Sequence, residues 1–367
     1  MLVDLEALSA NYRMLAGETY PSIVAPVVKA DAYGLGCAPV VERLWADGAR
    51  TVFVARLAEA EELRAALNPS VAPAIWVLDG CQDGQAERFA AAGAVPVINS
   101  IDQADAWSRR ATGAPAPTVL HVETGLNRLG LSYGDALGIA NDERYRSALN
   151  IECVMSHLSC ADAADHPMNA VQLRNFKRFC SLFPDALTSL AASDGVLLGP
   201  DYACQLVRPG VSLFGGGARG EPDQRVKAVA TLQAPVLQTK DLRPGDVVGY
   251  GAAYVADKPR RIAVVGAGYA DGVPRSWRGR GWIRGAACDV IGRISMDLTV
   301  FDVTDIPGVE PGDAMEIFGT HLSIDRMAED AGTIAYEILV RIGGRVKRVY
   351  LPEGDATHRA TGSPPEG

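Results

Sequence analysis

Several polar residues stand where apolar, β-rich runs of this sequence end. They are Lys29, Arg128, His157, Ser193 and Arg208. Lysine is seldom fully buried unless it is paired or used chemically. Burial beside other cations lowers the pKa of a lysine amine, which makes the amine a better nucleophile and base. Each residue alone also has an ordinary interpretation, such as a surface lysine, a loop arginine, a core histidine or a helix cap.

A reactive lysine near phosphate-binding groups favours pyridoxal phosphate, a cofactor that forms a Schiff base with lysine and acts as an electron sink. Groups able to hold its phosphate are the Ser193 hydroxyl, the amides of Gly210 and Val211, and the Tyr33 phenol. The sequence contains no GxSxG elbow and no P-loop, so it does not support a serine hydrolase or a P-loop enzyme. It has no HExxH, HxH or CxxC pattern either, and we expect no metal site.

The first 215 or so residues alternate between short β-rich runs and segments with helical spacing. Strands that are apolar on both faces and alternate with helices predict a parallel sheet. Eight of them predict a closed (β/α)8 barrel, with its active site at the carboxyl ends of the strands. An open doubly wound sheet is the alternative. The expected strands are Ser22–Val28, Thr51–Ala55, Ala74–Leu78, Val95–Asn99, Thr118–Glu123, Ile151–His157, Leu187–Ala192 and Gln205–Phe214.

Beyond residue 220 the pattern changes to long β-rich runs, which predict a second, mostly β domain over residues 221–351. We expect one clear helix there, near Ser323–Ala331, and an amphipathic helix over the first residues, MLVDLEALSANYRML. The first domain would then cover residues 1–220. The polar, Pro- and Gly-containing tail at 352–367 is expected to be disordered.

Composition narrows the class of protein. Hydrophobic residues make up 48% and charged residues 22% of the 367 residues, as in an ordinary globular protein. The net charge of −9 disfavours a nucleic-acid partner. No apolar run is long enough for a membrane helix, and the first residues lack the basic region of a secretory signal. Seven scattered cysteines are typical of reduced thiols, so we expect a cytoplasmic protein.

The segment VVKADAYGLG, residues 27–36, closely resembles the cofactor-lysine motif of alanine racemases. Further motifs follow in that family's order over roughly residues 1–351: HVETGLNRLG, MSHLSCAD, LAASDGVL, VRPGVSLFG, VGYGAAY, GYADG, GRISMD and TIAYE. The resemblance implies a fold-type III pyridoxal phosphate enzyme, with an N-terminal (β/α)8 barrel and a C-terminal β domain. It also implies a homodimer in which each active site combines one chain's barrel with the other chain's β domain.

The resemblance assigns roles to individual residues. Lys29 would carry the cofactor and act as the base on one face of Cα, and Tyr269 of the partner chain would act on the opposite face. Racemisation needs such a pair, because one group removes the α-proton and the other returns it from behind. His157 and Arg208 are the expected relay that tunes Tyr269, whose ordinary pKa near 10 makes it a poor base. Arg208 would face the pyridine nitrogen, to which it cannot readily give a proton.

The resemblance also implies the groups that bind the cofactor and the substrate. The phosphate would be held by Tyr33, Ser193, Gly210, Val211 and Tyr336. Arg128 would bind the cofactor's phenolic oxygen and, with the backbone of the partner's Met296, the substrate carboxylate. Three residues match positions near the entrance and the dimer interface: Asp162, Arg293 and Asp297.

The sequence departs from the common family pattern at five positions: Leu35, His121, Ala192, Asp194 and Ser295. His121 stands where some members have a lysine that is carbamylated and braces the arginine at position 128, so that brace cannot form here. None of the departures removes a proton-transfer group.

Four functions remain open. The first is alanine racemisation, which in bacteria supplies D-alanine for cell-wall synthesis or serves alanine catabolism. The second is racemisation of another amino acid, such as serine or lysine, because one methylene is worth only about 1–3 kcal/mol of discrimination. A decarboxylase of related fold is disfavoured by Arg208 and Tyr269. A non-catalytic pyridoxal phosphate carrier is disfavoured by the second domain and by the presence of both Lys29 and Tyr269.

Overall fold

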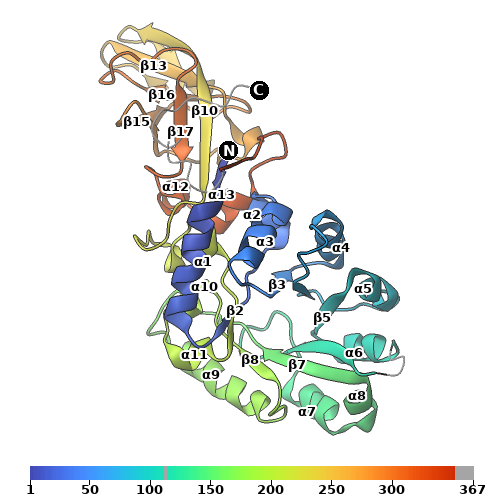
Figure 1. Cartoon of the computed structure of the whole chain (residues 1–367). Helices are drawn as coiled ribbons and strands as arrows, with labels where there is room; N and C mark the ends of the chain where they lie inside the picture. Colours follow the sequence, from blue (N-terminus) through green and yellow to red (C-terminus); the bar gives the residue numbers. More distant parts are fainter. Residues whose placement is uncertain (111–113, 352–367) are drawn as a thin grey trace. The chain divides into compact units, whose positions relative to one another are not determined.

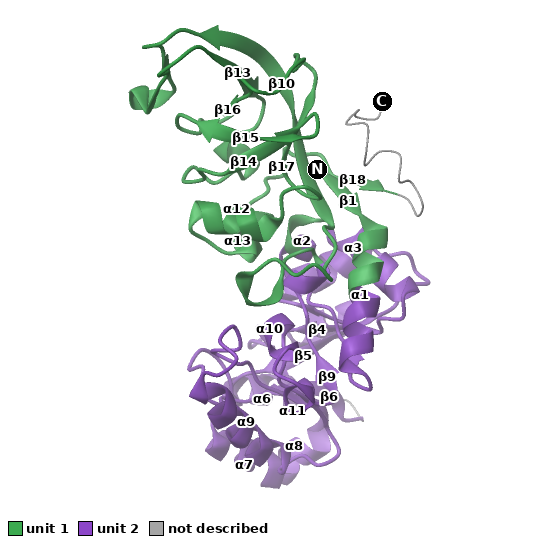
Figure 2. Ribbon diagram, turned by 90° about the vertical axis from the view of Figure 1, so that its left-hand side faces the viewer, with its two compact units in different colours: residues 1–11, 33–35, 214–367 green, residues 12–32, 36–213 purple. Residues whose placement is uncertain are grey.

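A computed structural model describes residues 1–110 and 114–351 of the chain. The chain divides into two compact units (Figure 2). We call residues 12–32 and 36–213 the barrel unit, and residues 1–11, 33–35 and 214 onwards the β unit. The expectation of a disordered tail concerns residues 352–367, which lie outside the described residues.

The barrel unit contains a closed ring of eight parallel strands. Strands β3 to β8 form a six-stranded parallel sheet, and β2 pairs in parallel with β9. The ring closes because Val27 bridges to Phe53 of β3, and Ala192, beyond β8, bridges to Arg208, beyond β9. The predicted (β/α)8 barrel is therefore confirmed. The alternative, an open doubly wound sheet, would leave two edge strands unpaired. The strands are β2 (Ile23–Val24), β3 (Thr51–Val54), β4 (Ala74–Val77), β5 (Ala94–Ile98), β6 (Ala116–His121), β7 (Leu149–Met155), β8 (Leu187–Ser189) and β9 (Leu206–Val207).

Helices cover the outside of this ring, as Figure 1 shows for α4 to α8. Local sequence explains where several of them begin. Ser100 accepts a bond from the Gln103 amide at the start of α6, and Ser132 and Asp135 form a capping box at the start of α7. The helices after β2 are α2 (Lys29–Gly34), α3 (Cys37–Ala46), α4 (Leu57–Ala66), α5 (Ala86–Ala92), α6 (Ile101–Ser108), α7 (Tyr133–Asn141), α8 (Glu143–Ala148), α9 (Pro167–Cys180), α10 (Ser193–Val196) and α11 (Pro200–Ala203).

The β unit is built on an eight-stranded sheet in the order β13-β16-β15-β14-β17-β10-β1-β18. Strand β13 also pairs with β10, so six of these strands close into an antiparallel barrel. The strands are β1 (Leu2–Asp4), β10 (Ala230–Leu242), β13 (Arg260–Val265), β14 (Arg280–Ile283), β15 (Ala286–Ile291), β16 (Thr299–Asp302), β17 (Ala314–Phe318) and β18 (Val349–Leu351), beside a hairpin of β11 (Val247–Val248) and β12 (Tyr254–Val255).

Two expectations for this unit need correction. The first residues were expected to start a helix, but Leu2–Asp4 form strand β1, which pairs with β10 and β18, before helix α1 (Leu5–Thr19) begins. The helix near Ser323–Ala331 is confirmed as α12 (Ile324–Ala331), but a second helix, α13 (Ala335–Val340), follows it. The first error arises because strands far along the chain pair with Leu2–Asp4. The second arises because α13 has six residues, too few to show a helical period.

The helices of the described ranges, 1–110 and 114–351, include none that is both long and apolar enough to span a bilayer.

Candidate active site

The chain leaves the barrel at Lys29 through an unusual turn. The Val28 amide still donates to the Phe53 carbonyl at 2.8 Å, but the backbone then turns left-handed. Residues Ala30 to Tyr33 have φ between 52° and 56°, and Gly34 has φ 81°. A left-handed conformation costs roughly 1–2 kcal/mol for each L-residue, and such strain persists only where the surroundings enforce it, often at functional sites. The strand predicted over Ser22–Val28 is shorter, Ile23–Val24, with an isolated bridge at Val27, and the left-handed turn after Val28 directs Lys29.

Two carboxylates hold the turn in place. Glu59 accepts from the amides of Ala30 at 2.8 Å and Ala55 at 2.7 Å, which ties the turn to the segment after β3. Asp31 accepts from the Cys37 amide at 2.7 Å, where α3 begins. The position of Lys29 is thus fixed by bonds to its neighbours and leaves its own side chain free.

The Lys29 amine is half-buried and forms no ion pair within residues 1–110 and 114–351. Burial and the positive charge of Arg128 lower its pKa, and the carboxylates of Glu59 and Asp79 only partly oppose them. A larger fraction of the amine is therefore neutral near pH 7 than in a free lysine, as a nucleophile or base requires.

Arg128 lies on a tight turn between β6 and α7. The turn is closed by bonds between the Leu131 amide and the His121 carbonyl, at 2.8 Å, and between the Glu123 amide and the Leu131 carbonyl, at 3.0 Å. Gly130 is required here, since a Cβ at this residue would lie 2.8 Å from the Glu123 nitrogen and its φ is 122°. The Arg128 side chain is exposed and pairs with no carboxylate in the described part of the chain. Its guanidinium is therefore available to an anionic ligand.

Arg208 follows β9 and is the most deeply buried of the candidate cations, at 3% exposure. Its guanidinium donates to the Ser189 hydroxyl, to the Ser156 carbonyl at 2.5 Å and to the Leu190 carbonyl at 3.4 Å. No carboxylate among the described residues forms an ion pair with it, and burial lowers its pKa to about 10. A buried charge without a counter-ion is costly, which indicates a role beyond stability.

Two histidines near Arg208 stay neutral at physiological pH. Burial, followed by the charges of Arg208 and Arg128, lowers the pKa of His157 to about 3 and that of His121 to about 4. His121 donates its Nδ1–H to Asn99 Oδ1 at 2.7 Å, because Asn99 Nδ2 already donates to the carbonyls of Leu78 and Val97. Its Nε2 therefore keeps a lone pair, and His121 carries no negative charge with which to brace Arg128.

Ser193 connects the two turns that follow β8 and β9. It begins α10, is buried, and its hydroxyl oxygen accepts from the amides of Gly210 at 3.0 Å and Ser212 at 3.4 Å. Val211 begins the next helical turn, Val211–Leu213, so its amide has no acceptor within that turn. The barrel unit thus places Ser193, Gly210 and Val211 together, as a phosphate site would need.

Tyr33 and Tyr336 meet in the β unit. Their rings lie 5.9 Å apart, and Tyr33 also packs on Phe214 at 5.0 Å. Tyr33 is buried, which raises the pKa of its phenol, so the hydroxyl remains protonated and can donate a hydrogen bond. Gly34, just beyond it, permits close contact with α13, since a Cβ there would lie 2.9 Å from the Leu339 carbonyl oxygen.

Tyr269 also belongs to the β unit, on a short turn, Tyr269–Asp271, that leaves its side chain 41% exposed. This turn interlocks with the segment that contains Met296: the Tyr269 amide donates to the Ser295 carbonyl at 3.1 Å and the Ala270 amide to the Met296 carbonyl at 2.9 Å. Gly268 has no room for a side chain, because a Cβ would lie 2.4 Å from the Met296 carbonyl oxygen. Tyr269 and Met296 are therefore held side by side.

The three residues expected near the entrance differ in their contacts. Asp297 pairs with Arg345 at 2.8 Å. Arg293 is exposed beside Gly251, and Asp162 is exposed without an ion pair in the described part of the barrel unit. Arg345 and Asn99 carry no sequence signal, because their partners Asp297 and His121 lie 48 and 22 residues away along the chain and share no motif with them.

Comparison with known proteins supports one assignment for this arrangement. The model of the alanine racemase N-terminal domain matches residues 3–218, and that of the C-terminal domain matches residues 229–350. The chain belongs to the alanine racemase family. It is 42% identical over 352 residues to an alanine racemase of Acidiphilium cryptum, covering 95% of this chain and 98% of that protein. It is 39% identical over 360 residues to a catabolic alanine racemase of Agrobacterium fabrum, covering 96% and 92%.

Solved structures of this family have the same fold. An alanine racemase of Bartonella henselae with covalently bound pyridoxal phosphate gives a TM-score of 0.88 at 34% identity, covering 95% of this chain and 98% of that one. An alanine racemase of Streptomyces coelicolor gives 0.88 at 33% identity, covering 96% and 97%.

Proposed function

We propose that the chain interconverts L- and D-alanine by a two-base mechanism, with Lys29 on one face of Cα and Tyr269 on the other. The activity itself, pyridoxal-phosphate-dependent racemisation of alanine by an isomerase, follows from family membership over almost the whole chain. The observation that carries the mechanism is the Lys29 amine, aimed by a strained turn and kept partly neutral by burial and by Arg128.

The residues of the barrel unit fit the cofactor. Arg208 is a buried cation without a carboxylate partner, which suits a ligand that presents a polar atom but needs no proton from the protein. Ser193 retains its hydroxyl proton for donation, because its oxygen only accepts from backbone amides. When bound, pyridoxal phosphate supplies an electron sink that makes the α-proton of an amino acid removable. We assign its ring nitrogen to Arg208 and its phosphate to Ser193, Gly210, Val211, Tyr33 and Tyr336.

The proton transfers fall to Lys29 and Tyr269. Lys29 removes the proton on its own face with its neutral amine, and returns a proton there from the ammonium form. Tyr269 is the acid and base of the other face, and its phenol must be tuned because its ordinary pKa is near 10. His157 is suited to take part in such a relay, since it is neutral and can both accept and donate a hydrogen bond. Arg208 sets the electrostatic field of that relay.

Arg128 and the Met296 backbone are assigned to the substrate carboxylate. Arg128 has an exposed guanidinium with no carboxylate partner in the described ranges, and Met296 is held beside Tyr269. We further propose that residues 1–220 bind the cofactor, and that residues 221–351 supply Tyr269 and Met296 to the active site of a partner chain in a homodimer. A cytoplasmic location stays a prediction from the sequence.

Chiral chromatography of amino acids incubated with the purified protein and pyridoxal phosphate tests the activity. We expect D-alanine to form fastest from a panel of L-amino acids and to approach an equal mixture. Faster racemisation of serine or lysine would retain the mechanism and change the substrate. Absence of every D-isomer, with cofactor visibly bound, would contradict the proposal. Inactive Lys29→Ala protein is the matched control against a contaminating racemase.

A further inference from the structure

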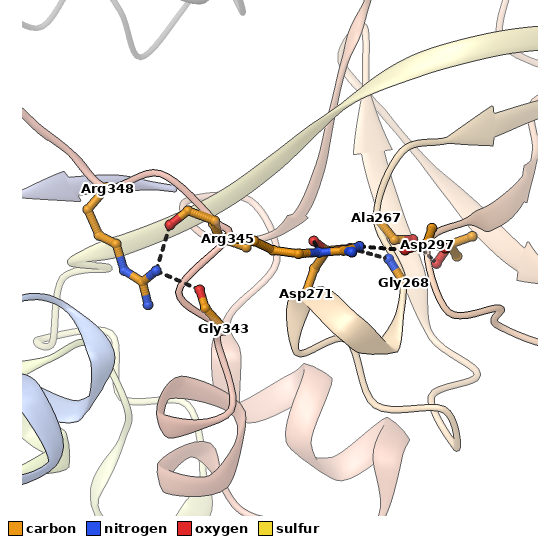
Figure 3. Close-up of polar contacts among 9 residues, drawn as sticks. Ala267, Gly268, Asp271, Asp297, Gly343, Arg345 and Arg348 are labelled. Atoms are coloured by element: carbon orange, nitrogen blue, oxygen red, sulfur yellow. Dashed lines mark hydrogen bonds and ion pairs between the residues drawn. The ribbon is translucent and has the colours of Figure 1, made fainter.

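Arg345 connects two segments that carry proposed active-site residues (Figure 3). Its Nε donates to Asp271 Oδ1 at 2.7 Å and its Nη2 to Asp271 Oδ2 at 2.9 Å, so the planar guanidinium meets the carboxylate with two parallel bonds. The same Nη2 donates to Asp297 Oδ1 at 2.8 Å. We call these bonds the Arg345 bridge. All three residues belong to the β unit.

Both ends of the bridge lie next to a residue of the proposed mechanism. Asp271 is two residues after Tyr269 and closes its turn by accepting from the Gly268 amide at 2.8 Å. Asp297 directly follows Met296, whose carbonyl accepts from the Ala270 amide. A buried bond from the Thr299 hydroxyl to the Ala267 carbonyl, at 2.8 Å, fixes the start of the Tyr269 turn. The bridge adds a second attachment at its other end.

The segment that carries Arg345 is itself anchored. Arg348 donates to the Gly343 carbonyl at 2.7 Å, as Figure 3 shows. It also donates to the Val346 carbonyl at 2.6 Å, and its Nε donates to the Gly34 carbonyl at 3.0 Å. The backbone around Arg345 is therefore tied to the turn that contains Tyr33. An arginine on such a support can hold other segments in place, whereas one on a free loop would move with them.

Stability alone explains the Arg345 bridge poorly. The Arg345 side chain is 48% exposed and that of Asp297 58%, and exposed ion pairs contribute little to folding. Asp271 is largely covered, at 13%. Burial alone would raise its pKa, but the bonds from Arg345 and Gly268 lower it, so it remains charged and bonded. The bridge is better suited to setting geometry than to stabilising the fold.

We propose that Arg345 is a positioning residue for racemisation, which fixes the Tyr269 phenol and the Met296 backbone relative to each other. This inference rests on the two-base mechanism proposed above. A displacement of about 1 Å at a reacting group can reduce a rate about a hundredfold, so loss of the bridge acts on the Tyr269 face of the substrate. The Lys29 face should be spared, because the turn that aims Lys29 is held by bonds within the barrel unit, to Glu59 and Asp31.

The experiment compares Arg345→Gln holoenzyme with Arg284→Gln as the matched control. Arg284 donates two bonds to Asp313 in the same unit and is 47% exposed, but neither partner adjoins Tyr269 or Met296. Racemisation of alanine and uptake of deuterium at Cα without inversion are followed in D2O for each enantiomer. At equilibrium the enantiomers are equal in amount, so racemisation must fall equally in both directions. The exchange without inversion reports each base separately.

For Arg345→Gln we expect racemisation to fall about 10–100-fold. Exchange should persist within about threefold for the enantiomer that Lys29 deprotonates, and the absorbance of the bound cofactor should not change. Arg345→Lys keeps the positive charge but cannot donate two parallel hydrogen bonds to one carboxylate, so its rate should lie between those of Arg345→Gln and the unaltered protein. Asp297→Asn, which removes only the exposed arm, serves if Arg345→Gln does not fold, and should mainly raise KM.

Equal rates in Arg345→Gln and Arg284→Gln would overturn the inference, as would equal losses of exchange for both enantiomers. Tyr269→Phe measured alongside separates the two proposals. If it loses exchange on one enantiomer while Arg345→Gln behaves like its control, the two-base mechanism stands and the positioning role fails. If Tyr269→Phe shows no such asymmetry, the mechanism and the inference fail together.

Discussion

The two sets of proposed catalytic groups are held in opposite ways. Around Lys29 and Arg208 the barrel unit uses burial, backbone carbonyls, hydroxyls and the charge of neighbouring cations, which outweigh the carboxylates near Lys29. Around Tyr269 the β unit uses an exposed turn, held by interlocked backbone bonds and an ion-paired arginine. The first arrangement sets pKa values, and the second sets position.

The difference indicates a division of labour between the units. The barrel unit shifts the pKa of Lys29 and of both histidines with its own residues. The β unit presents Tyr269 at 41% exposure, without a buried environment of its own. Burial alone disfavours the charged form of a tyrosine, so a tyrosine base needs neighbouring positive charge. The buried, cationic Arg208 of the barrel unit is such a charge, in agreement with the proposal that the barrel unit of a partner chain receives Tyr269.

Removal of the lysine should give the largest effect. Lys29→Ala loses both the attachment of the cofactor and one of the two bases, so we expect loss of the Schiff-base absorbance and a rate at least about 10²–10⁴-fold lower. Absorbance spectra and chiral chromatography measure the two effects together. Wild-type turnover in this variant would refute the assignment of Lys29.

A single methyl group should disturb the β unit without reaching the barrel unit. In Gly268→Ala the new Cβ meets the carbonyls of Ser295 and Met296, so the interlocked segments must separate and racemisation should fall about 10–100-fold. Gly344→Ala is the control, since a Cβ there meets nothing within 4 Å. The cofactor absorbance should be unchanged in both. Near-normal racemisation by Gly268→Ala would show that the position of Tyr269 does not depend on this contact.

The smallest effect concerns pH and folding of the barrel unit. The pKa of His121 is about 4 in the folded protein, below its ordinary value of about 6.5. Between these two pH values the unfolded chain binds a proton at His121 and the folded chain does not. The free energy of unfolding of the cofactor-free protein should therefore increase by roughly 1–3 kcal/mol as the pH rises from about 4 to 6.5.

Denaturant titrations at several pH values measure this slope, which His121→Asn should reduce. His157 contributes to the same slope and remains in that variant. His166→Asn is the control, because His166 is exposed and only caps α9. An unchanged slope in His121→Asn would contradict the assignment of a buried, neutral His121.

Much of this account follows from the sequence, and the exceptions have physical causes. All eight strands of the parallel barrel were predicted near their observed positions, because strands buried on both faces form continuous apolar runs. Strand β1 was missed because its pairing partners lie far along the chain, and helix α13 because six residues show no helical period. The left-handed turn after Lys29 was not foreseen either, since Ala, Asp and Tyr carry no local signal for positive φ.

The residues of the proposed site also divide into those that the sequence predicts and those that only the structure reveals. Lys29, Arg128, Ser193 and Arg208 were found because the carboxyl ends of the strands locate the site in this fold. The Arg345 bridge could not be found that way, because it joins Asp271 to an arginine 74 residues later. In the sequence Arg345, Asp271 and Asp297 are ordinary charged residues, and only the structure shows that they bond to one another.

The two-base mechanism is tested most directly by Tyr269→Phe holoenzyme incubated with each enantiomer of alanine in D2O. We expect cofactor to remain bound and racemisation to fall equally in both directions, by about 10²–10⁴-fold. Deuterium should still enter Cα of the enantiomer that Lys29 deprotonates, and should cease to enter the other. Small, equal losses of exchange for both enantiomers would contradict the assignment of the two faces to Lys29 and Tyr269.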